Sequence, residues 1–266
     1  ITSIEQLIHY KKNSISKLKI CIKLNTGLNR FGIGCNDIDE ILKKCFELDF
    51  DIVGVYTHMA NSTSNDVLST DTEDQYGRYM ICVNQIKEKF PNIETHYSDS
   101  SVLVKGSIRV KDVSSIRTGM FILGMDPIPS ISNKFSNPYF VLSFNMVVLD
   151  KHAIKCGEFY GYEKRTRRDI YTCTIGIGYC DGMKKAWVGN DLVSFESNNL
   201  KILDISMNTS IIEVSKRQFK QIQCMQTKLN LFSNQKELNE LAVVANTSIE
   251  DIVSGLNSIN NSIRYD

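Results

Sequence analysis

The sequence predicts an α/β fold in its first half and a β-strand domain in its second half. In the first half, short apolar runs alternate with helical stretches such as Asp37–Leu48 and Asp74–Phe90. Alternation of strands and helices at this spacing indicates βα units, and therefore a parallel sheet or barrel. Two short helices are expected near the end of the chain, over Lys236–Val244 and over Ser248–Leu256 with its first residue as N-cap. The second half otherwise carries successive strand candidates, which are Tyr139–Leu149, Ile170–Gly178, Leu200–Ile205 and Ser210–Val214.

A segment bracketed by prolines marks the change between the two halves. Pro127–Asn137 is rich in serine and asparagine, and proline and serine clusters of this kind are typical of loops and linkers. We therefore expect two domains, residues 1–130 and residues 131–266.

Composition and charge exclude several classes of function. The chain has 31 basic and 30 acidic residues, so its net charge gives no electrostatic reason to bind nucleic acid or a membrane surface. No apolar run approaches the roughly 20 residues that cross a bilayer, and the first residues show no signal-peptide pattern. The eight cysteines are scattered without a CxxC pair, so we expect reduced thiols and neither a disulfide framework nor a metal site. These features predict a cytoplasmic protein.

Four apolar runs in the first half each end in residues that can carry chemistry. Because the carboxyl ends of parallel strands meet at one mouth of a barrel, such residues are expected to lie together there. A single one of them is as easily a solvated loop cation or a satisfied core histidine. Four in succession favour a site. In chain order, the residues that follow the runs are Lys23 and Arg30, His58, His96 and Ser100, and Arg117.

These segments, together with others further along the chain, resemble the alanine racemases, which are fold-type III pyridoxal 5′-phosphate (PLP) enzymes. The resemblance implies the second half of a TIM-type (β/α)8 barrel followed by the family's C-terminal β domain. It also implies an isomerase that converts L-alanine to D-alanine for peptidoglycan precursors, acts on a small amino acid and forms a head-to-tail homodimer. The matching stretches occur in the family's order and are Lys23–Gly32, Val55–Ser62, His96–Ser101, Ile116–Gly124, Phe159–Gly161, Ile177–Gly182 and Ile205–Met207.

One element of the family's pattern is absent from this sequence. Members of the family bind PLP through a lysine in a Lys-Ala-Asn-Ala-Tyr-Gly-type motif on the first barrel strand, and these 266 residues contain no such motif. We therefore expect a fragment whose Schiff-base lysine lies upstream of Ile1, with little activity on its own. The alternative is a non-catalytic relative without the lysine that binds an amino acid or a phosphate ligand.

By this resemblance, six residues bind the cofactor. Arg117 matches the arginine that faces the pyridine nitrogen, and because a guanidinium has only donors, that nitrogen stays unprotonated. The histidines match one that packs against the cofactor ring and one that supports the arginine, and the other three match phosphate-binding positions. From the residues alone, ordinary loop turns, a surface salt bridge and core histidines remain alternatives. The six are His58, His96, Ser100, Arg117, Gly119 and Met120.

Tyr160 is the predicted catalytic residue. It matches the family's second base, which removes the α-proton on the face opposite the lysine and acts in the partner subunit's site; a buried strand tyrosine is the alternative. Arg30 and the backbone N–H of Met207 match positions that bind the substrate carboxylate, although core packing is the simpler role for the methionine side chain. Tyr179 matches a tyrosine of the access channel. Lys23 matches a lysine that is carbamylated in some members and pairs with the arginine at position 30.

Two departures from the family's pattern bear on specificity. Glu250 stands where the family has a tyrosine that reaches the phosphate, and Asn208 replaces an aspartate of the access channel. Because a carboxylate beside a phosphate is repulsive, we expect Glu250 to point away and to leave a larger pocket. Serine and other small amino acids therefore stand beside alanine as candidate substrates.

Overall fold

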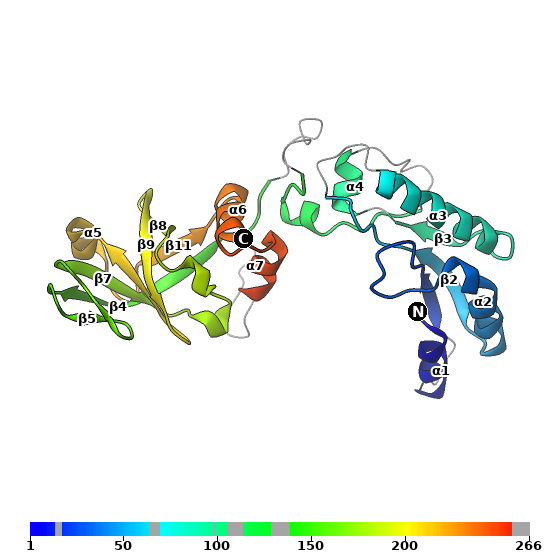
Figure 1. Cartoon of the computed structure of the whole chain (residues 1–266), viewed down its shortest axis with the longest axis horizontal. Coiled ribbons are helices and arrows are strands. Elements are labelled where there is room, and N and C mark those ends of the chain that lie inside the picture. The colour runs from blue at the N-terminus through cyan, green and yellow to red at the C-terminus, as the bar shows by residue number, and fades with distance from the viewer. Residues whose placement is uncertain (14–17, 64–69, 98, 106–113, 129–138, 257–266) are drawn as a thin grey trace. The chain divides into compact units, whose positions relative to one another are not determined.

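A computed structural model describes residues 1–13, 18–63, 70–97, 99–105, 114–128 and 139–256. The chain divides into two compact units, Ile1–Tyr139 and Phe140–Asp266 (Figure 1). Most of the predicted linker, Pro127–Asn137, lies outside the described residues. Of the helices in the described ranges, none is long and apolar enough to span a bilayer.

The first unit alternates helices with parallel strands, as the sequence predicts. The strands pair in the order β1-β2-β3, and both pairings are parallel. Predicted helix Asp37–Leu48 corresponds to α2, and Asp74–Phe90 corresponds to α3, which begins four residues earlier. The elements are α1 (Ile4–Asn13), β1 (Lys19–Lys23), η1 (Cys35–Asp37), α2 (Ile38–Glu47), β2 (Asp51–Tyr56), α3 (Thr70–Lys87), β3 (Glu94–His96), α4 (Ser100–Lys105) and η3 (Met120–Leu123).

Helices and sheet of the first unit share one hydrophobic core. On α2, Ile38, Ile41 and Cys45 recur at intervals of three and four residues, which places them on one face of the helix, and all three are fully buried. They belong to the same cluster as Ile22 of β1 and Val55 of β2. Burial of each large side chain contributes about 1.5–3 kcal/mol, so this core holds β1 and β2 against α2.

The fourth apolar run is not a strand, which corrects the sequence-based prediction. Residues 115–118 have no regular secondary structure. Just before them, the Ser114 backbone N–H donates to the Thr95 carbonyl at 2.8 Å, and the Thr95 N–H donates to Ser114 Oγ at 3.1 Å. The segment is therefore tied to β3 by these two bonds and carries Arg117 on irregular backbone. Between Ser115 and Arg117 only Ile116 is apolar, which is too little to specify a strand.

The expectation of eight reduced cysteines is also wrong in one place. Cys35, at the start of η1, forms a disulfide with Cys82 of α3 across a sequence separation of 47 residues. Cys82 is fully buried. The spacing of two cysteines gives no sign of such a pairing, because the contact depends on how α3 packs beside η1.

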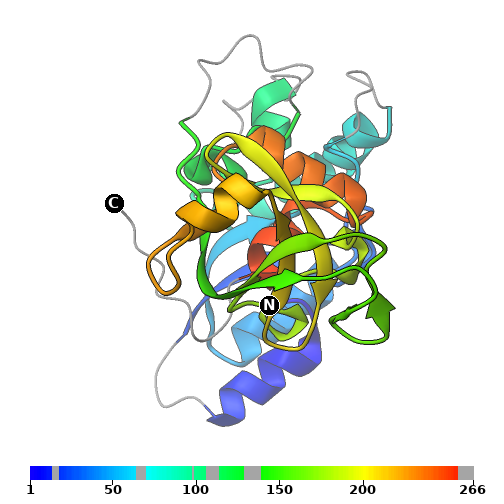
Figure 2. The same cartoon turned by 90° about the vertical axis from the view of Figure 1, so that its left-hand side faces the viewer.

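The second unit is a closed β barrel with the strand order β10-β7-β4-β11-β8-β9 (Figures 1 and 2). All of its strand pairings are antiparallel. A separate hairpin, β5–β6, is inserted between β4 and β7. The elements are β4 (Phe144–Ile154), β5 (Phe159–Tyr160), β6 (Lys164–Arg165), β7 (Ile170–Ile175), η5 (Tyr179–Asp181), η6 (Lys185–Trp187), β8 (Asp191–Phe195), β9 (Asn198–Ile205), β10 (Ser210–Val214), α5 (Lys216–Gln221), β11 (Lys228–Phe232), α6 (Gln235–Val244) and α7 (Ile249–Gly255).

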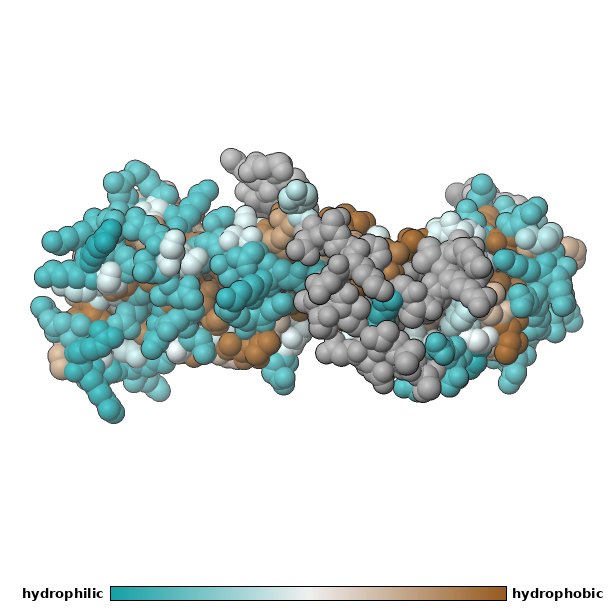
Figure 3. Space-filling model, turned by 90° about the horizontal axis from the view of Figure 1, so that it is seen from above, coloured by the Kyte–Doolittle hydropathy of each residue, from teal (hydrophilic) through white to brown (hydrophobic). Residues whose placement is uncertain are grey.

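The sequence predicts much of this barrel but not all of it. Strand candidates correspond to β4, β7, β9 and β10, and both C-terminal helices are confirmed, with the Ser248 hydroxyl capping α7 by accepting from the Asp251 N–H at 3.2 Å. β8 and β11 are five-residue strands with polar residues between apolar ones, and they were missed. Most of the face of this unit seen in Figure 3 is hydrophilic, which agrees with strands that bury one face.

Candidate active site

Three side chains lie in one row at the carboxyl ends of the parallel strands. Lys23 of β1 is the register partner of Tyr56 of β2, and Tyr56 is the register partner of His96 of β3. Register partners on parallel strands project from the same face of the sheet. The Tyr56 and His96 rings stack with centroids 5.0 Å apart and an interplanar angle of 8°, and Lys23 Nζ lies 6.0 Å from the Tyr56 ring centroid. Sequence reasoning found Lys23 and His96 but missed Tyr56.

Two arginines join this row. Arg117 lies with its guanidinium carbon 4.5 Å from the Tyr56 ring centroid. Arg30 lies near Lys23 because both contact the Phe31 ring. Lys23 Nζ is 3.7 Å and the Arg30 guanidinium carbon 5.3 Å from the ring centroid. Aromatic faces attract cations but do not neutralise them. Among the described residues, Lys23, Arg30 and Arg117 take part in no ion pair with a carboxylate.

Lys23 is the most constrained of these cations. It is only 3% exposed. Burial lowers the pKa of its amine, and the positive charges of Arg30 and Arg117 lower this pKa further. A buried amine among like charges is held closer to its neutral form than a surface lysine.

Both predicted histidines favour the neutral form. Burial lowers the pKa of His58; Asp99 opposes the shift, while Arg117, Arg30 and Lys23 add to it. Burial and the charge of Arg117 lower the pKa of His96. The Nδ1 atom of His96 is buried and has no hydrogen-bond partner within the part of the chain that the structure describes. A neutral imidazole can offer both a donor and an acceptor to a ligand.

The predicted phosphate-binding residues are brought together by one hydrogen bond. Ser100 is buried at the first residue of α4, and its Oγ lies 2.8 Å from Thr118 Oγ1. Thr118 directly precedes Gly119 and Met120, which lead into η3. A side chain at position 119 would meet nothing within 4 Å, so the space beside this backbone is open to a ligand.

The loop that carries Arg30 is fixed by contacts with α3. Thr26 accepts from Arg78 Nε through its carbonyl at 2.8 Å, and its hydroxyl accepts from Gln75 Nε2 at 3.0 Å. Thr26 Oγ1 also lies 2.7 Å from Thr57 Oγ1, next to His58. Gln75 Nε2 donates in addition to the His58 carbonyl at 2.8 Å. One glutamine therefore fixes both the loop after β1 and the segment after β2.

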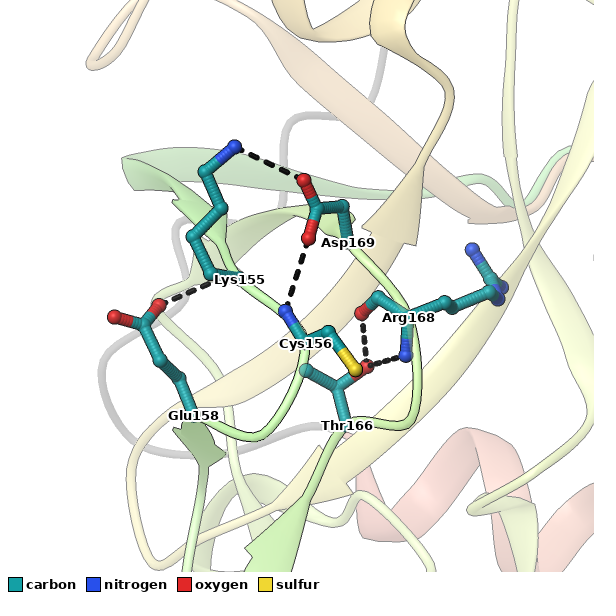
Figure 4. Close-up of polar contacts among 6 residues, drawn as sticks. All are labelled: Lys155, Cys156, Glu158, Thr166, Arg168 and Asp169. Atoms are coloured by element: carbon teal, nitrogen blue, oxygen red, sulfur yellow. Dashed lines mark hydrogen bonds and ion pairs between the residues drawn. The ribbon is translucent and has the colours of Figure 1, made fainter.

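The remaining predicted residues lie in the second unit. Tyr160 is half-buried on β5. The base of its hairpin is closed by Asp169, whose carboxylate accepts from the Cys156 N–H and from Lys155 Nζ, each at 2.9 Å (Figure 4). On the same limb as Asp169, Thr166 Oγ1 donates to the Arg168 carbonyl at 2.6 Å (Figure 4).

Tyr179 and Met207 lie on adjacent loops of this unit. The Tyr179 N–H donates to the Ser206 carbonyl, and the Cys180 N–H donates to the Met207 carbonyl, each at 3.0 Å. Gly178 permits this approach, because a Cβ there would collide with the Met207 carbonyl oxygen. Tyr179 is 45% and Met207 55% exposed, so both side chains are accessible.

The two residues that depart from the family's pattern are exposed. Asn208 follows Met207 on its loop, and Glu250 lies in the first turn of α7. A cavity of about 920 Å³ in the same unit is lined by residues of mixed charge, including Arg168, Glu213 and Lys216. None of the predicted site residues lines it, so volume alone does not locate the candidate site.

Comparison with known proteins identifies the family of both units. Residues 1–127 match the family model described as alanine racemase, N-terminal domain, and residues 141–263 match alanine racemase, C-terminal domain. An alanine racemase from Nostoc sp. is 27% identical over 64% of this chain and 44% of its own length. One from Helicobacter pylori is 24% identical over 96% of this chain and 71% of its own length. The chain spans about half the length of several of the curated relatives it matches.

Solved structures show the same fold. The alanine racemase from Bacillus anthracis with bound L-Ala-P has a TM-score of 0.78 at 21% identity, covering 97% of this chain and 67% of that chain. The alanine racemase from Bartonella henselae with covalently bound pyridoxal phosphate has a TM-score of 0.71 at 20% identity, covering 96% and 68%.

Proposed function

The chain belongs to the alanine racemase family, and from this premise we propose that the complete protein interconverts L- and D-alanine with PLP as cofactor. The observation that carries the proposal is the set of three cations, Lys23, Arg30 and Arg117, gathered around two aromatic rings without a carboxylate partner among the described residues. Such a set suits a ligand with a flat ring and negative charge. We further propose that β1, β2 and β3 are consecutive strands of a (β/α)8 barrel, since they are parallel and joined through helices.

The donors at this site fit PLP. Its phosphate would take the Ser100 and Thr118 hydroxyls and the backbone N–H groups at Gly119 and Met120, where space is open. Arg117 would donate to the pyridine nitrogen, and His58 and His96, held neutral by their surroundings, would lie beside the ring. PLP, when bound there, would supply an electron-withdrawing ring that makes the α-proton of the substrate acidic.

The chain's own residues then bind the substrate and move the proton. Arg30 and the Met207 N–H would bind the substrate carboxylate, which fixes the amino acid's orientation. The Tyr160 phenolic oxygen would accept the α-proton on its face in one direction of the reaction and donate a proton to that face in the other, while a second base acts on the opposite face. Tyr179 would line the access channel. Lys23, buried beside Phe31, would keep Arg30 in place either as an amine or as a carbamate.

Three wider aspects are part of the proposal. By family resemblance, Tyr160 would serve the site of a partner subunit, so the active form would be a head-to-tail homodimer. The product, D-alanine, would supply peptidoglycan precursors in the cytoplasm.

The test uses the complete protein encoded by the gene, purified and supplied with PLP. We expect conversion of L-alanine to D-alanine, measured with a D-amino-acid oxidase assay. Arg117→Gln should lower both PLP affinity and turnover by about tenfold or more, because it removes a charge-assisted contact. Arg217→Gln, which changes an exposed arginine of α5 in the second unit, is the matched control and should stay within about twofold. If the PLP-supplied protein racemises neither alanine nor another small amino acid, the proposal is wrong.

Specificity is decided by the same assay. The exposed position of Glu250 favours a pocket without the family's tyrosine wall, so serine is the second candidate substrate. The ratio of kcat/KM for alanine to that for serine distinguishes the two. Calorimetric binding of an amino acid without turnover would instead identify a non-catalytic relative.

A further inference from the structure

The hairpin that carries Tyr160 is hydrogen-bonded at its base, where the Gly157 N–H donates to the Thr166 carbonyl at 2.8 Å and Asp169 bonds Lys155 and Cys156, but its tip is short. β5 and β6 contain two residues each and form a sheet of their own. Phe159 is 55% and Tyr162 78% exposed, so neither side chain anchors the hairpin in a core. A short isolated hairpin is at best marginally stable in water. The base contacts alone hold this short tip weakly, so contacts with the barrel contribute to the position of Tyr160.

An ion pair joins the hairpin to the barrel. Lys164, the register partner of Tyr160 across the hairpin, donates through Nζ to Asp204 Oδ1 at 2.7 Å and to the Leu203 carbonyl at 3.0 Å. Asp204 belongs to β9 of the barrel and is 6% exposed. The Lys164–Asp204 pair thus joins the short hairpin to β9 of the barrel, at the residue opposite Tyr160.

The same carboxylate also touches the residue that follows Tyr160. Gly161 has a φ of +61°, and a Cβ there would collide with Asp204 Oδ2. Oδ2 itself is buried without a hydrogen-bond donor within the described residues. Asp204 therefore contacts two neighbours of Tyr160. One is Gly161, the next residue in the chain, and the other is Lys164, the residue opposite Tyr160 in the hairpin and the charge partner of Asp204.

Electrostatics favour a persistent pair. Burial would raise the pKa of Asp204, but the hydrogen bond and charge of Lys164, together with the charge of Lys185, outweigh burial and hold this pKa below its usual value. The carboxylate is therefore ionised at neutral pH. Because the pair is partly shielded from water, it differs from the Lys155–Asp169 pair at the hairpin base, whose side chains are 72% and 57% exposed.

We propose that Lys164 and Asp204 are positioning residues that hold the β5–β6 hairpin so that the Tyr160 hydroxyl is presented at the reacting carbon. The proposal rests on the proposed function of Tyr160. It goes beyond it by assigning the placement of the proton acceptor to a lysine and an aspartate that touch neither substrate nor cofactor.

The experiment is a double-mutant cycle in the complete, PLP-supplied protein, well below its melting temperature. The readout is exchange of the α-proton for deuterium, measured separately from L- and D-alanine. Lys164→Met should reduce exchange from the enantiomer served by Tyr160 by about tenfold or more, and exchange from the other enantiomer by less than about threefold. Lys164→Arg, which keeps a cation, should restore most of the loss.

The decisive arm combines Lys164→Met with Tyr160→Phe. If Lys164 acts through Tyr160, Lys164→Met introduced into the Tyr160→Phe protein should cause no further loss of exchange on that face. Lys155→Met is the matched control and should change neither exchange rate by more than about twofold, because its pair is solvent-exposed.

The outcomes separate the two proposals. Equal losses for both enantiomers, or a Lys164→Met effect that persists in Tyr160→Phe, would overturn the positioning role while the racemase assignment stands. Absence of exchange from either enantiomer in the unmodified protein would refute the proposed function instead. If Lys164→Met fails to fold, Asp204→Asn is tested in its place with the same expected asymmetry.

Discussion

The two units treat buried charge in opposite ways. In the first unit, Lys23 is 3% exposed and shares its surroundings with Arg30 and Arg117, with no carboxylate partner among the described residues. In the second unit, Asp204 is 6% exposed and is paired with Lys164 at 2.7 Å. An unpaired buried charge costs stability, whereas a hydrogen-bonded pair holds elements in place.

This difference suggests how to tell a binding site from a scaffold within one chain. Like charges kept together without a partner indicate that a ligand of opposite charge completes the site. Paired charges indicate that the fold itself is complete there. The cation set of the first unit therefore fits a ligand site, and the ion pair of the second unit fits a support for a reacting side chain.

The largest expected effect is on Tyr160, which tests whether the supported hairpin has a catalytic purpose. In the complete protein, Tyr160→Phe should lower racemisation in both directions by about 10²–10⁴, which is typical of loss of a positioned acid–base group. PLP binding should be unchanged, since the phenol is not an anchor for the cofactor. Tyr162→Phe, a change at a tyrosine that is 78% exposed on the same hairpin, is the control and should retain activity.

The pattern of α-deuterium exchange sharpens this prediction. Exchange from the enantiomer served by Tyr160 should fall much more than exchange from the other. Equal losses, together with a lowered melting temperature, would make Tyr160 a packing residue.

The next effect concerns the disulfide of the first unit. Cys35 and Cys82 close a loop that contains β2 and part of α3, so the double substitution Cys35→Ser and Cys82→Ser should lower the free energy of unfolding by about 2–4 kcal/mol. Denaturant unfolding with and without a reductant measures this. Cys156→Ser, at an exposed thiol of the second unit, is the control. If reductant shifts the unfolding of the double variant as much as that of the parent protein, the assigned pairing is wrong.

A smaller effect, of opposite sign in the two units, tests the comparison directly. Lys23→Met should raise the free energy of unfolding of the ligand-free protein by about 1 kcal/mol, because an apolar side chain replaces a buried charge among like charges. Lys164→Met should lower it, because it leaves Asp204 without its partner. Thermal melts of the ligand-free variants measure both. If Lys23→Met instead lowers the free energy of unfolding, the Lys23 charge stabilises the folded protein and the interpretation of Lys23 as an unpaired buried charge is wrong.

Sequence reasoning located side chains better than it located their supports. The strand ends that carry Lys23, His58 and His96 follow from apolar runs and helical periodicity, which are local properties. Tyr56 was missed, because a tyrosine within an apolar run is indistinguishable from core until its register partners are known.

The supports were missed for a related reason. The Lys164–Asp204 pair joins residues 40 positions apart, and the Cys35–Cys82 pair joins residues 47 positions apart. Each depends on the packing of two elements and leaves no local pattern. Arg117 was expected at the end of a fourth strand, and although the described backbone there is irregular, its guanidinium lies over the Tyr56 ring at the end of β2.

The smallest expected effect is the pH dependence of stability, which should differ between the units. Burial lowers the pKa of His58 and of His96 below 6.5 in the folded state. As pH falls through 6.5, the unfolded chain therefore takes up protons that the folded chain does not, so stability is lost toward acid. The pKa of Asp204 lies below 3.8, and the stability that its ionisation contributes is lost only as pH falls through that lower range. Between pH 7 and 5 the first unit should weaken while the second does not.

Two probes separate the units in this measurement. Trp187, the single tryptophan, is fully buried in the second unit, with its Nε1 donating to the Leu241 carbonyl at 3.0 Å, so its fluorescence reports that unit. Amide hydrogen exchange of β1–β3 reports the first unit. The pair of substitutions His58→Gln and His96→Gln should flatten the loss of β1–β3 protection between pH 7 and 5, whereas His152→Gln, at an exposed histidine of β4, should not. If Trp187 becomes exposed over the same pH interval, the second unit is as acid-sensitive as the first. The lowered pKa values of His58 and His96 would then not explain the loss of stability, and the comparison between the units would be wrong.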